Sequence, residues 1–249
     1  MTSSSSWQAP PEHLSLACDV VHVWLARLKQ PAARARALLE LLSPDERERA
    51  ARFRFERDRE SFINARGILR TLLGRYLEQE PASLRFDYNA YGKPSLAGAS
   101  AATTALRFNL SHAHQLALYA FAREREVGID LEYMREEFAC EEIAGRFFSE
   151  REVEGLRGLA EDRRKEGFFN CWTRKEAYIK ARGLGLSLPL DEFDVSLAPG
   201  EPAALLDVRD EPLELQRWSL RELMPAAGYA AAVAVEGSGW RLECWRWGE

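Results

Sequence analysis

The hydrophobic pattern of the chain passes from a helical to an extended period twice, in the same order. Helices are expected where apolar residues recur every three or four positions, at 34–42, from Pro44, at 57–77, at 143–148, from Ser149 and at 164–182. Strands are expected where β-branched and aromatic residues gather in short runs, at 20–25, 84–88, 106–110, 116–121, 127–133, 193–197, 215–220, 229–235 and 241–247. This order predicts an α+β protein of two lobes that meet near residues 120–140.

Capping and turn signals divide the chain further. Ser43-Pro44-Asp45-Glu46 and Ser149-Glu150-Arg151-Glu152 are capping boxes, with a glutamate three residues after a serine. The insert at 95–105, mostly Ala, Ser and Thr, is expected to be a loop. We expect a flexible N-terminus at 1–13, an N-terminal lobe at 14–125 and a C-terminal lobe at 126–249.

The composition of the 249-residue chain is that of a soluble globular protein and excludes several functions. A net charge of −5 argues against a protein that coats nucleic acid or an anionic membrane, because such binding comes mostly from neutralised phosphates. The four cysteines form no C-x-x-C pair, so neither a zinc ribbon nor a disulfide framework is indicated. With no signal-peptide pattern and no long apolar window, we expect a cytoplasmic monomer without nucleic-acid or membrane partners.

Asp130 and Glu132 lie in the expected strand at 127–133. Side chains alternate across a strand, so the two carboxylates share one face while Ile129 and Leu131 pack on the other. Neighbouring like charges repel unless a cation lies between them, and a hard divalent ion is the usual partner. Gly128 on the same face would let a ligand approach. An acidic pair on a strand is more often a solvated face, so alternation alone leaves both interpretations open.

Glu176 and Lys180 stand four residues apart on the expected helix at 164–182 and project side by side. By themselves they predict an exposed ion pair. Together with the carboxylates of the strand, they would supply a third acidic group and an ammonium group. Such a set could hold a magnesium ion that binds substrate phosphates, while Lys180 neutralises the same oxyanions.

Two further segments carry polar side chains at turns or strand ends. Lys93, in the turn Tyr-Gly-Lys-Pro, is either a solvated lysine or a phosphate contact. Ser111 and His112 end the strand that follows, but adjacent strand residues point to opposite faces and no G-x-S-x-G sequence is present. These facts argue against a serine nucleophile. His112 fits a phosphate donor or a structural histidine equally well.

In order, the segments 91–94, 108–112, 128–132 and 172–180 resemble the motif series of the surfactin-type 4′-phosphopantetheinyl transferases. The resemblance extends from about Ser43 to Leu197. It implies two similar, pseudo-twofold α+β lobes in one chain, with the active site at their junction, where coenzyme A and Mg²⁺ bind. It also implies the reaction, in which 4′-phosphopantetheine passes from coenzyme A to a serine hydroxyl of an apo acyl or peptidyl carrier protein, with release of adenosine 3′,5′-bisphosphate.

The resemblance assigns roles residue by residue. It implies Asp130, Glu132 and Glu176 as the metal ligands, and Glu176, Lys180 and Glu132 as the catalytic residues. A carboxylate at Glu176 or Glu132, or a water, would take the proton of the carrier serine. The implied coenzyme A contacts are Arg66, Arg70, Lys93, Pro94, Asn109, Ser111, His112 and Lys180. The family carries basic residues for the 3′-phosphate on the helix before the first strand group, where Arg49 and Arg59 are alternatives to Arg66 and Arg70.

Two other functions compete with this one. A magnesium nuclease would use Glu-x-Lys on a strand, whereas here the spacing is Glu-x-x-x-Lys on a helix. A coenzyme A- or carrier-binding module without transfer activity would have lost some of the acidic residues, yet all are present. We expect the carrier to dock on part of 134–150, where Phe138, Ile143, Arg146, Phe147 and Phe148 combine apolar and basic side chains.

Overall fold

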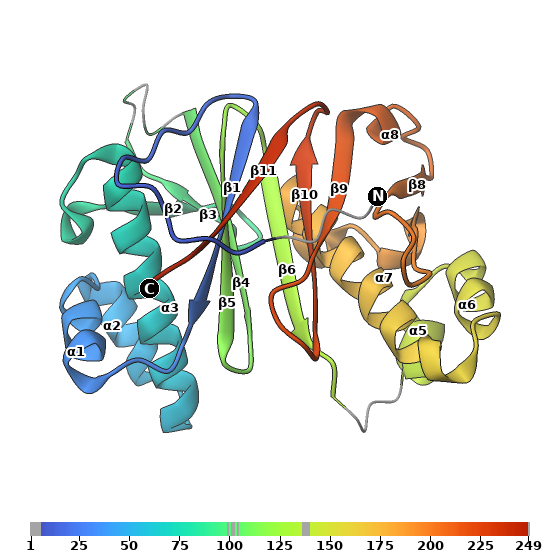
Figure 1. Cartoon of the computed structure of the whole chain (residues 1–249), viewed down its shortest axis with the longest axis horizontal. Coiled ribbons are helices and arrows are strands. Elements are labelled where there is room, and N and C mark those ends of the chain that lie inside the picture. The colour runs from blue at the N-terminus through green and yellow to red at the C-terminus, as the bar shows by residue number, and fades with distance from the viewer. Residues whose placement is uncertain (1–5, 99, 101–102, 104, 136–139, 249) are drawn as a thin grey trace.

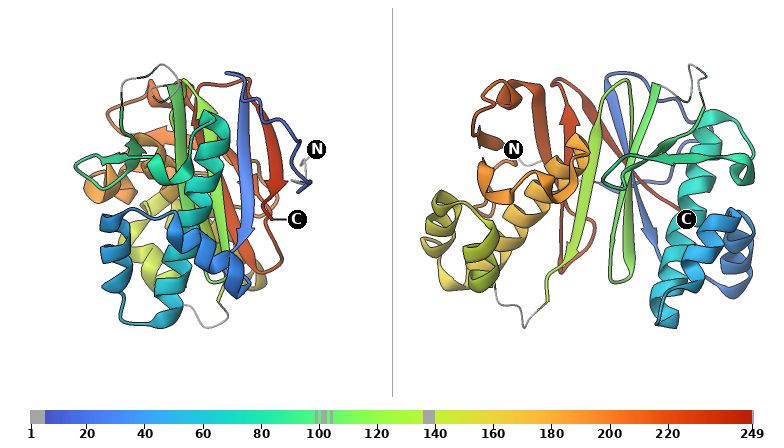
Figure 2. Two further views of the ribbon diagram at one scale, coloured as in Figure 1. Left: turned by 90° about the vertical axis from the view of Figure 1, so that its left-hand side faces the viewer. Right: turned by 180° about the vertical axis from the view of Figure 1, so that it is seen from behind.

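The computed structural model describes residues 6–98, 100, 103, 105–135 and 140–248. Two β-sheets pack face to face in the middle of the molecule (Figure 1). A group of helices covers the outer face of each sheet, as the views from the side and from behind also show (Figure 2). The described part of the chain contains no helix whose length and apolar character would let it cross a lipid bilayer. The two-lobed α+β architecture predicted from the sequence is confirmed.

The first lobe begins with strand β1, continues through three helices and returns in a hairpin and a pair of strands. Its elements are β1 (Val20–Arg27), α1 (Ala32–Glu40), α2 (Pro44–Ala51), α3 (Glu56–Leu77), the short helix η1 (Pro81–Ser83), β2 (Phe86–Tyr88), β3 (Pro94–Leu96), β4 (Leu106–Ala113) and β5 (Leu116–Arg123). Strands β1, β5 and β4 are adjacent in one sheet, and β2 pairs with β3 separately.

The second lobe repeats this plan. Its elements are β6 (Val127–Tyr133), α5 (Cys140–Phe147), α6 (Glu150–Arg157), α7 (Glu161–Arg182), η2 (Gly185–Ser187), η3 (Leu190–Glu192), β7 (Phe193–Val195), β8 (Leu205–Val208), α8 (Glu214–Arg217), β9 (Trp218–Leu223) and β10 (Tyr229–Glu236). The order β6-β10-β9 matches β1-β5-β4, and the long helices α3 and α7 both have 22 residues. The two lobes are therefore repeats of one arrangement.

Three apolar clusters hold the layers together. One lies between α3 and the first sheet around Trp24 and Leu69, and another lies between α7 and the second sheet around Phe168 and Tyr178. The third lies between the two sheets, where alternate residues of β1, β5, β6 and β10 meet. Because Ile129 belongs to this middle cluster, the opposite face of β6 is turned toward α7. The alternation expected for this strand is confirmed.

The last strand crosses back to the first lobe. Strand β11 (Arg241–Arg246) pairs in parallel with β1, so the first sheet runs β11-β1-β5-β4 (Figure 1). Trp245 of β11 packs against the rings of His22 and Trp24, with ring centroids 4.1 and 5.1 Å away. The end of the chain thus completes the sheet in which its beginning lies.

Two sequence expectations fail locally. The strand expected at 215–220 starts as helix α8, because the buried carboxylate of Glu214 accepts hydrogen bonds from Trp218 Nε1 at 2.6 Å and from Arg182. The loop expected at 95–105 begins with strand β3, which pairs with β2. Residues 99, 101, 102 and 104 of that loop lie outside the described residues.

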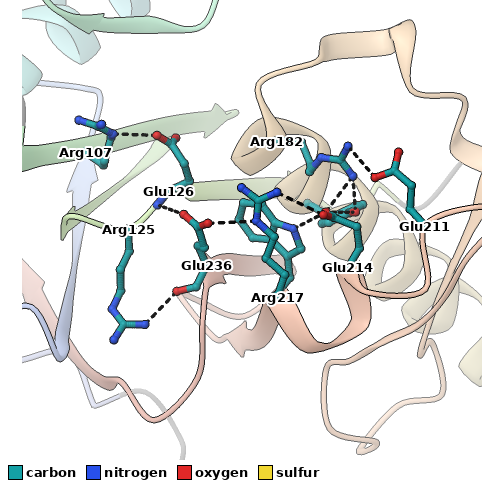
Figure 3. A network of polar contacts seen from close by, with 10 residues as sticks. Arg107, Arg125, Glu126, Arg182, Glu211, Glu214, Arg217 and Glu236 are labelled. Carbon is teal, nitrogen blue, oxygen red and sulfur yellow. Dashed lines mark hydrogen bonds and ion pairs between the residues drawn. The ribbon is translucent and has the colours of Figure 1, made fainter.

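A chain of polar contacts links the lobes at the start of β6 (Figure 3). The Glu126 carboxylate accepts hydrogen bonds from Arg107 Nε at 2.7 Å and from Lys93 Nζ at 2.9 Å. The backbone N–H of Glu126 donates to the Glu236 carboxylate, which also pairs with Arg217 (Figure 3). These contacts tie β4 of the first lobe to β10 and α8 of the second and fix the edge of the junction.

Candidate functional site

Asp130, Lys180 and Ser111 meet at the junction of the lobes. Lys180 Nζ on α7 lies 2.5 Å from Asp130 Oδ1 on β6 and 3.1 Å from Ser111 Oγ on β4. Ser111 Oγ donates to the same Asp130 oxygen at 2.9 Å. Burial lowers the pKa of Lys180, and the ion pair with Asp130 raises it. The net effect is an increase, so Lys180 stays charged. An ammonium group is thereby fixed beside a buried carboxylate.

The close approach of α7 to β6 creates this contact, and Gly128 permits it. A Cβ atom at Gly128 would lie 2.1 Å from the carbonyl oxygen of Ala177 and 2.3 Å from the nitrogen of Ala181. Gly128 therefore makes room for the helix backbone, not for a ligand as its position on the acidic face suggested. Lys180 reaches Asp130 because the glycine lets the two elements touch.

Glu132 and Glu176 face the same region from β6 and α7. Burial, followed by the charge of Asp130, raises the pKa of Glu132 to about 7. Burial also raises the pKa of Glu176, with a further contribution from Asp130 and an opposing one from Lys180. Both carboxylates are therefore able to exchange protons nearer to neutral pH than an ordinary glutamate.

The three carboxylates do not surround a common point. Among the described residues, no three acidic, histidine or cysteine side chains lie close enough together to hold a metal ion as they stand. The Lys180 ammonium group pairs with Asp130 Oδ1. The metal-binding role of Asp130, Glu132 and Glu176 stays a prediction. Asp130 Oδ2 is buried and has no hydrogen-bond partner among the described atoms. One oxygen of the site thus remains available to a cation.

A pocket of about 320 Å³ opens beside Ser111 and Lys180, and we call it the Ser111 pocket. It gathers side chains from α2, α3, the β2–β3 hairpin, β4 and α7. Its lining residues are Arg49, Phe62, Ala65, Arg66, Tyr88, Gly92, Pro94, Leu110, Ser111, His112 and Lys180. Five of the eight coenzyme A contacts predicted from the sequence, Arg66, Pro94, Ser111, His112 and Lys180, are among them.

A larger cleft of about 810 Å³ adjoins this pocket and shares Phe62 and His112 with it. We call it the Tyr133 cleft. Tyr133, 38% exposed, stacks on His114 with ring centroids 4.9 Å apart, and Glu132 lies on the same wall. His112 stands between the two spaces. Burial, followed by the charge of Lys180, lowers the pKa of His112, so the free site holds a neutral imidazole there.

Arg70, Lys93 and Asn109 do not line the Ser111 pocket, and their side chains make hydrogen bonds within the protein. Arg70, 1% exposed, donates to Glu46 and to the carbonyl oxygens of Pro81 and Leu84. Lys93 Nζ donates to Glu126 and to the carbonyl oxygen of Ala181, and Asn109 Oδ1 accepts from the backbone N–H of Ile129. Lys93 and Asn109 thus join the lobes.

Tyr88 and Phe62 line the Ser111 pocket without having been predicted from the sequence. The turn at Gly92 and Lys93 could have predicted the position of Tyr88, because a hairpin there places Tyr88 opposite Pro94, as the structure does. In the sequence Phe62 is an ordinary member of the apolar stripe of α3, and nothing local distinguishes it as a pocket residue.

Family models and curated relatives match nearly the whole chain. The description "4'-phosphopantetheinyl transferase, N-terminal" matches residues 30–124, and "4'-phosphopantetheinyl transferase superfamily" matches residues 126–234. The 4'-phosphopantetheinyl transferase HetI of a Nostoc species is 44% identical over 97% of this chain and 98% of its own length. The chain belongs to the 4′-phosphopantetheinyl transferase family. This confirms the resemblance found in the sequence motifs.

A second relative matches a shorter part of the chain. The 4'-phosphopantetheinyl transferase Sfp of Bacillus subtilis is 33% identical over 64% of this chain and 68% of its own length. The two matched regions divide between β5 and β6, so Ser111 lies in the first and its hydrogen-bond partner Asp130 lies in the second.

Proposed function

We propose that the protein transfers 4′-phosphopantetheine from coenzyme A to a serine hydroxyl of an apo carrier protein, in a reaction that requires Mg²⁺. The serine oxygen bonds to the phosphorus that carries the pantetheine arm, and the bond from that phosphorus to the bridging oxygen breaks, which releases adenosine 3′,5′-bisphosphate. The observation that carries the proposal is the contact of Lys180 and Ser111 with buried Asp130 at the wall of the Ser111 pocket.

The Ser111 pocket suits a ligand with several phosphates. Arg49, Arg66 and Lys180 line it, and neutral His112 adds a further donor. Phosphoryl transfer needs little covalent chemistry from the protein and depends on positioning and on stabilisation of developing negative charge. A cation that is already fixed in place, such as Lys180 on Asp130, supplies that stabilisation without having to reorganise.

The side chains around Asp130 fit a divalent cation in chemical type. The unpartnered Oδ2 of Asp130 is a hard oxygen ligand. Glu132 on β6 and Glu176 on α7 contribute two more carboxylates near Asp130. We propose these three residues as the ligands of Mg²⁺. A bound Mg²⁺ supplies neutralisation of the charge that develops on the pyrophosphate oxygens.

The proton of the carrier serine passes to a carboxylate in this proposal. Glu132, whose pKa is raised to about 7 when no cation is bound, is one carboxylate that can accept the proton. Glu176, whose pKa is also raised, is the other acceptor within the same group. Fatty-acid, polyketide and nonribosomal-peptide carriers share the attacked serine, so the proposal covers all three.

Mass spectrometry of apo carriers incubated with the protein, coenzyme A and Mg²⁺ tests the proposal. We expect the carrier to gain the mass of one phosphopantetheine group, and a serine-to-alanine carrier to gain nothing. Coenzyme A binding without any modification of a panel of carriers would instead identify a binding module. Cleavage of DNA in the presence of Mg²⁺ would identify a nuclease. We also propose that the enzyme acts as a cytoplasmic monomer, and sedimentation analysis would check the oligomeric state.

A further inference from the structure

The two lobes use the same device to attach their second helix to their long helix. Helices α2 and α6 both start with a capping box whose glutamate, Glu46 or Glu152, is 2% exposed and reaches a buried cation. Glu46 Oε2 accepts from the backbone N–H of Ser43 at 3.0 Å and from Arg70 Nε at 2.7 Å. Glu152 Oε2 accepts from the backbone N–H of Ser149 at 3.0 Å and pairs with Lys175 Nζ at 2.8 Å.

Arg70 and Lys175 are equivalent residues. Arg70 lies fourteen residues after Glu56, the first residue of α3, and Lys175 lies fourteen residues after Glu161, the first residue of α7. The pair formed by Oε2 is therefore part of the fold that both lobes share. This ion pair attaches the short helix to the long helix, and its partners all belong to the fold.

The second oxygen of each glutamate is used differently. Glu152 Oε1 accepts from the backbone N–H of Val195 at 2.8 Å, whereas Glu46 Oε1 accepts from Arg66 Nε at 2.6 Å. Arg66 lies ten residues into α3, and the residue ten positions into α7 is Cys171, which is fully buried in the apolar core. The second lobe folds with a thiol at this position, so the shared fold does not require a cation there.

Arg66 differs from Arg70 in what lies around it. It lines the Ser111 pocket, while its guanidinium lies over the Phe86 ring at 4.5 Å and donates to the Tyr88 hydroxyl. These contacts use Nε and Nη2, and no described residue is hydrogen-bonded to Nη1. A guanidinium held on its Nε edge and on one face keeps its geometry when a planar or tetrahedral anion arrives.

We propose that Glu46 is a positioning residue that fixes the Arg66 guanidinium in the Ser111 pocket, where it binds a phosphate group of coenzyme A. The inference rests on the proposed function. One carboxylate then has two tasks, because Oε2 maintains the helix attachment and Oε1 orients the ligand-binding cation. The second lobe performs only the first task. Since an arginine on a flexible stem loses rotamer freedom on binding, its prior fixation raises affinity for the anion.

Isothermal titration of coenzyme A without a carrier protein tests the inference. Glu46→Asp keeps the charge but draws the carboxylate back by one methylene, so it cannot reach both arginines as before. We expect coenzyme A affinity to fall about three- to tenfold, since displacement of a positioned contact weakens it. Glu152→Asp is the matched control. It disturbs the equivalent capping box and buried pair, and we expect affinity within about twofold of wild type despite a similar loss of thermal stability.

Arg66→Gln is a second variant that keeps the pair between Glu46 and Arg70. We expect it to lose about tenfold or more in coenzyme A affinity, as for the loss of a charged hydrogen bond to phosphate. In the double variant, Glu46→Asp should add no further loss to that of Arg66→Gln.

Three results would overturn the inference: an equal loss of affinity in Glu152→Asp and Glu46→Asp, additive losses in the double variant, or full affinity in Arg66→Gln. Titration of 3′-dephospho-coenzyme A identifies the phosphate concerned, because the effect of Arg66→Gln disappears with that ligand if the 3′-phosphate is bound. Failure of the proposed transfer is a separate outcome, since a protein that binds coenzyme A without modifying carriers would still show the dependence on Glu46.

Discussion

At the residue scale, one oxygen of Asp130 pairs with Lys180, and we propose that the other binds Mg²⁺. We expect Asp130→Ala and Glu176→Ala each to lower the rate of carrier modification on the order of 100-fold or more, because each removes a preorganised charge from the site. Initial rates with saturating coenzyme A would measure this. Glu166→Ala, an exposed glutamate on the same helix as Glu176, is the control and should retain wild-type turnover. A folded Asp130→Ala variant with near wild-type turnover would remove Asp130 from the site.

Glu132 makes the site sensitive to pH near neutrality. Its pKa is raised to about 7, so at pH 6 most of the carboxyl is protonated and at pH 8 most is charged. A charged carboxylate binds a divalent cation better than a neutral one, and we therefore expect Mg²⁺ affinity to rise between pH 6 and pH 8. Titration of Mg²⁺ into the coenzyme A complex would detect the rise, and Glu132→Gln should flatten it. The same slope in Glu132→Gln would assign the titration to another group.

At the scale of the elements, the site depends on how closely α7 approaches β6. We expect Gly128→Ala to destabilise the protein on the order of 3 kcal/mol, because the new methyl group would overlap the backbone of Ala177 and Ala181. It should also separate Lys180 from Asp130 and reduce turnover. Denaturant unfolding and carrier modification would measure the two effects.

Gly145→Ala is the control for that substitution. Gly145 is in α5, and a Cβ atom there meets nothing within 4 Å. We expect this variant to be about 0.5 to 1 kcal/mol more stable than wild type, because alanine loses less backbone entropy in a helix. If both glycine variants behaved alike, close packing at Gly128 would not be the cause.

Helix α5 lies within the segment 134–150 where we expect the carrier to dock. Phe148, just after its end, is buried, and Phe147 packs against the Trp172 ring at 5.9 Å, so both contribute to the core of the second lobe. Arg146 is exposed, while Phe138 lies outside the described residues. We expect Arg146→Glu to weaken transfer to an acidic carrier severalfold and to leave coenzyme A binding unchanged. Equal loss of both activities would contradict docking at α5.

Most elements were predictable because their signals are local. The capping boxes at Ser43 and Ser149 mark the starts of α2 and α6, and alternation in β6 gives the orientation of Asp130. The pairing of Asp130 with Lys180, and the use of Arg70 and Lys93 in the scaffold, could not be predicted in this way. They depend on which elements touch, and a charged residue on a helix looks the same in sequence whether it meets a ligand or a buried carboxylate.

At the scale of the whole molecule, β11 belongs to a different sheet from the strands that precede it. We expect a chain that stops after Gly239 to lose cooperative unfolding of the first lobe, because β1 loses its parallel partner and Trp245 no longer covers Trp24. Circular dichroism during denaturation would show a broadened transition. A chain lacking only Gly248 and Glu249 is the control and should unfold as wild type does. A cooperative transition in the longer truncation would show that β11 is dispensable.

The pairing of β11 with β1 has a consequence for protein synthesis. A ribosome makes β1 long before β11, so one edge of the first sheet stays unpaired until the helices and strands between them have emerged. During that interval the nascent protein exposes an edge strand to which other chains could add, and pairing across so long a stretch of sequence closes slowly. We therefore expect the nascent protein to depend on chaperones during translation. We also expect it to aggregate when translation stalls before β11 is made.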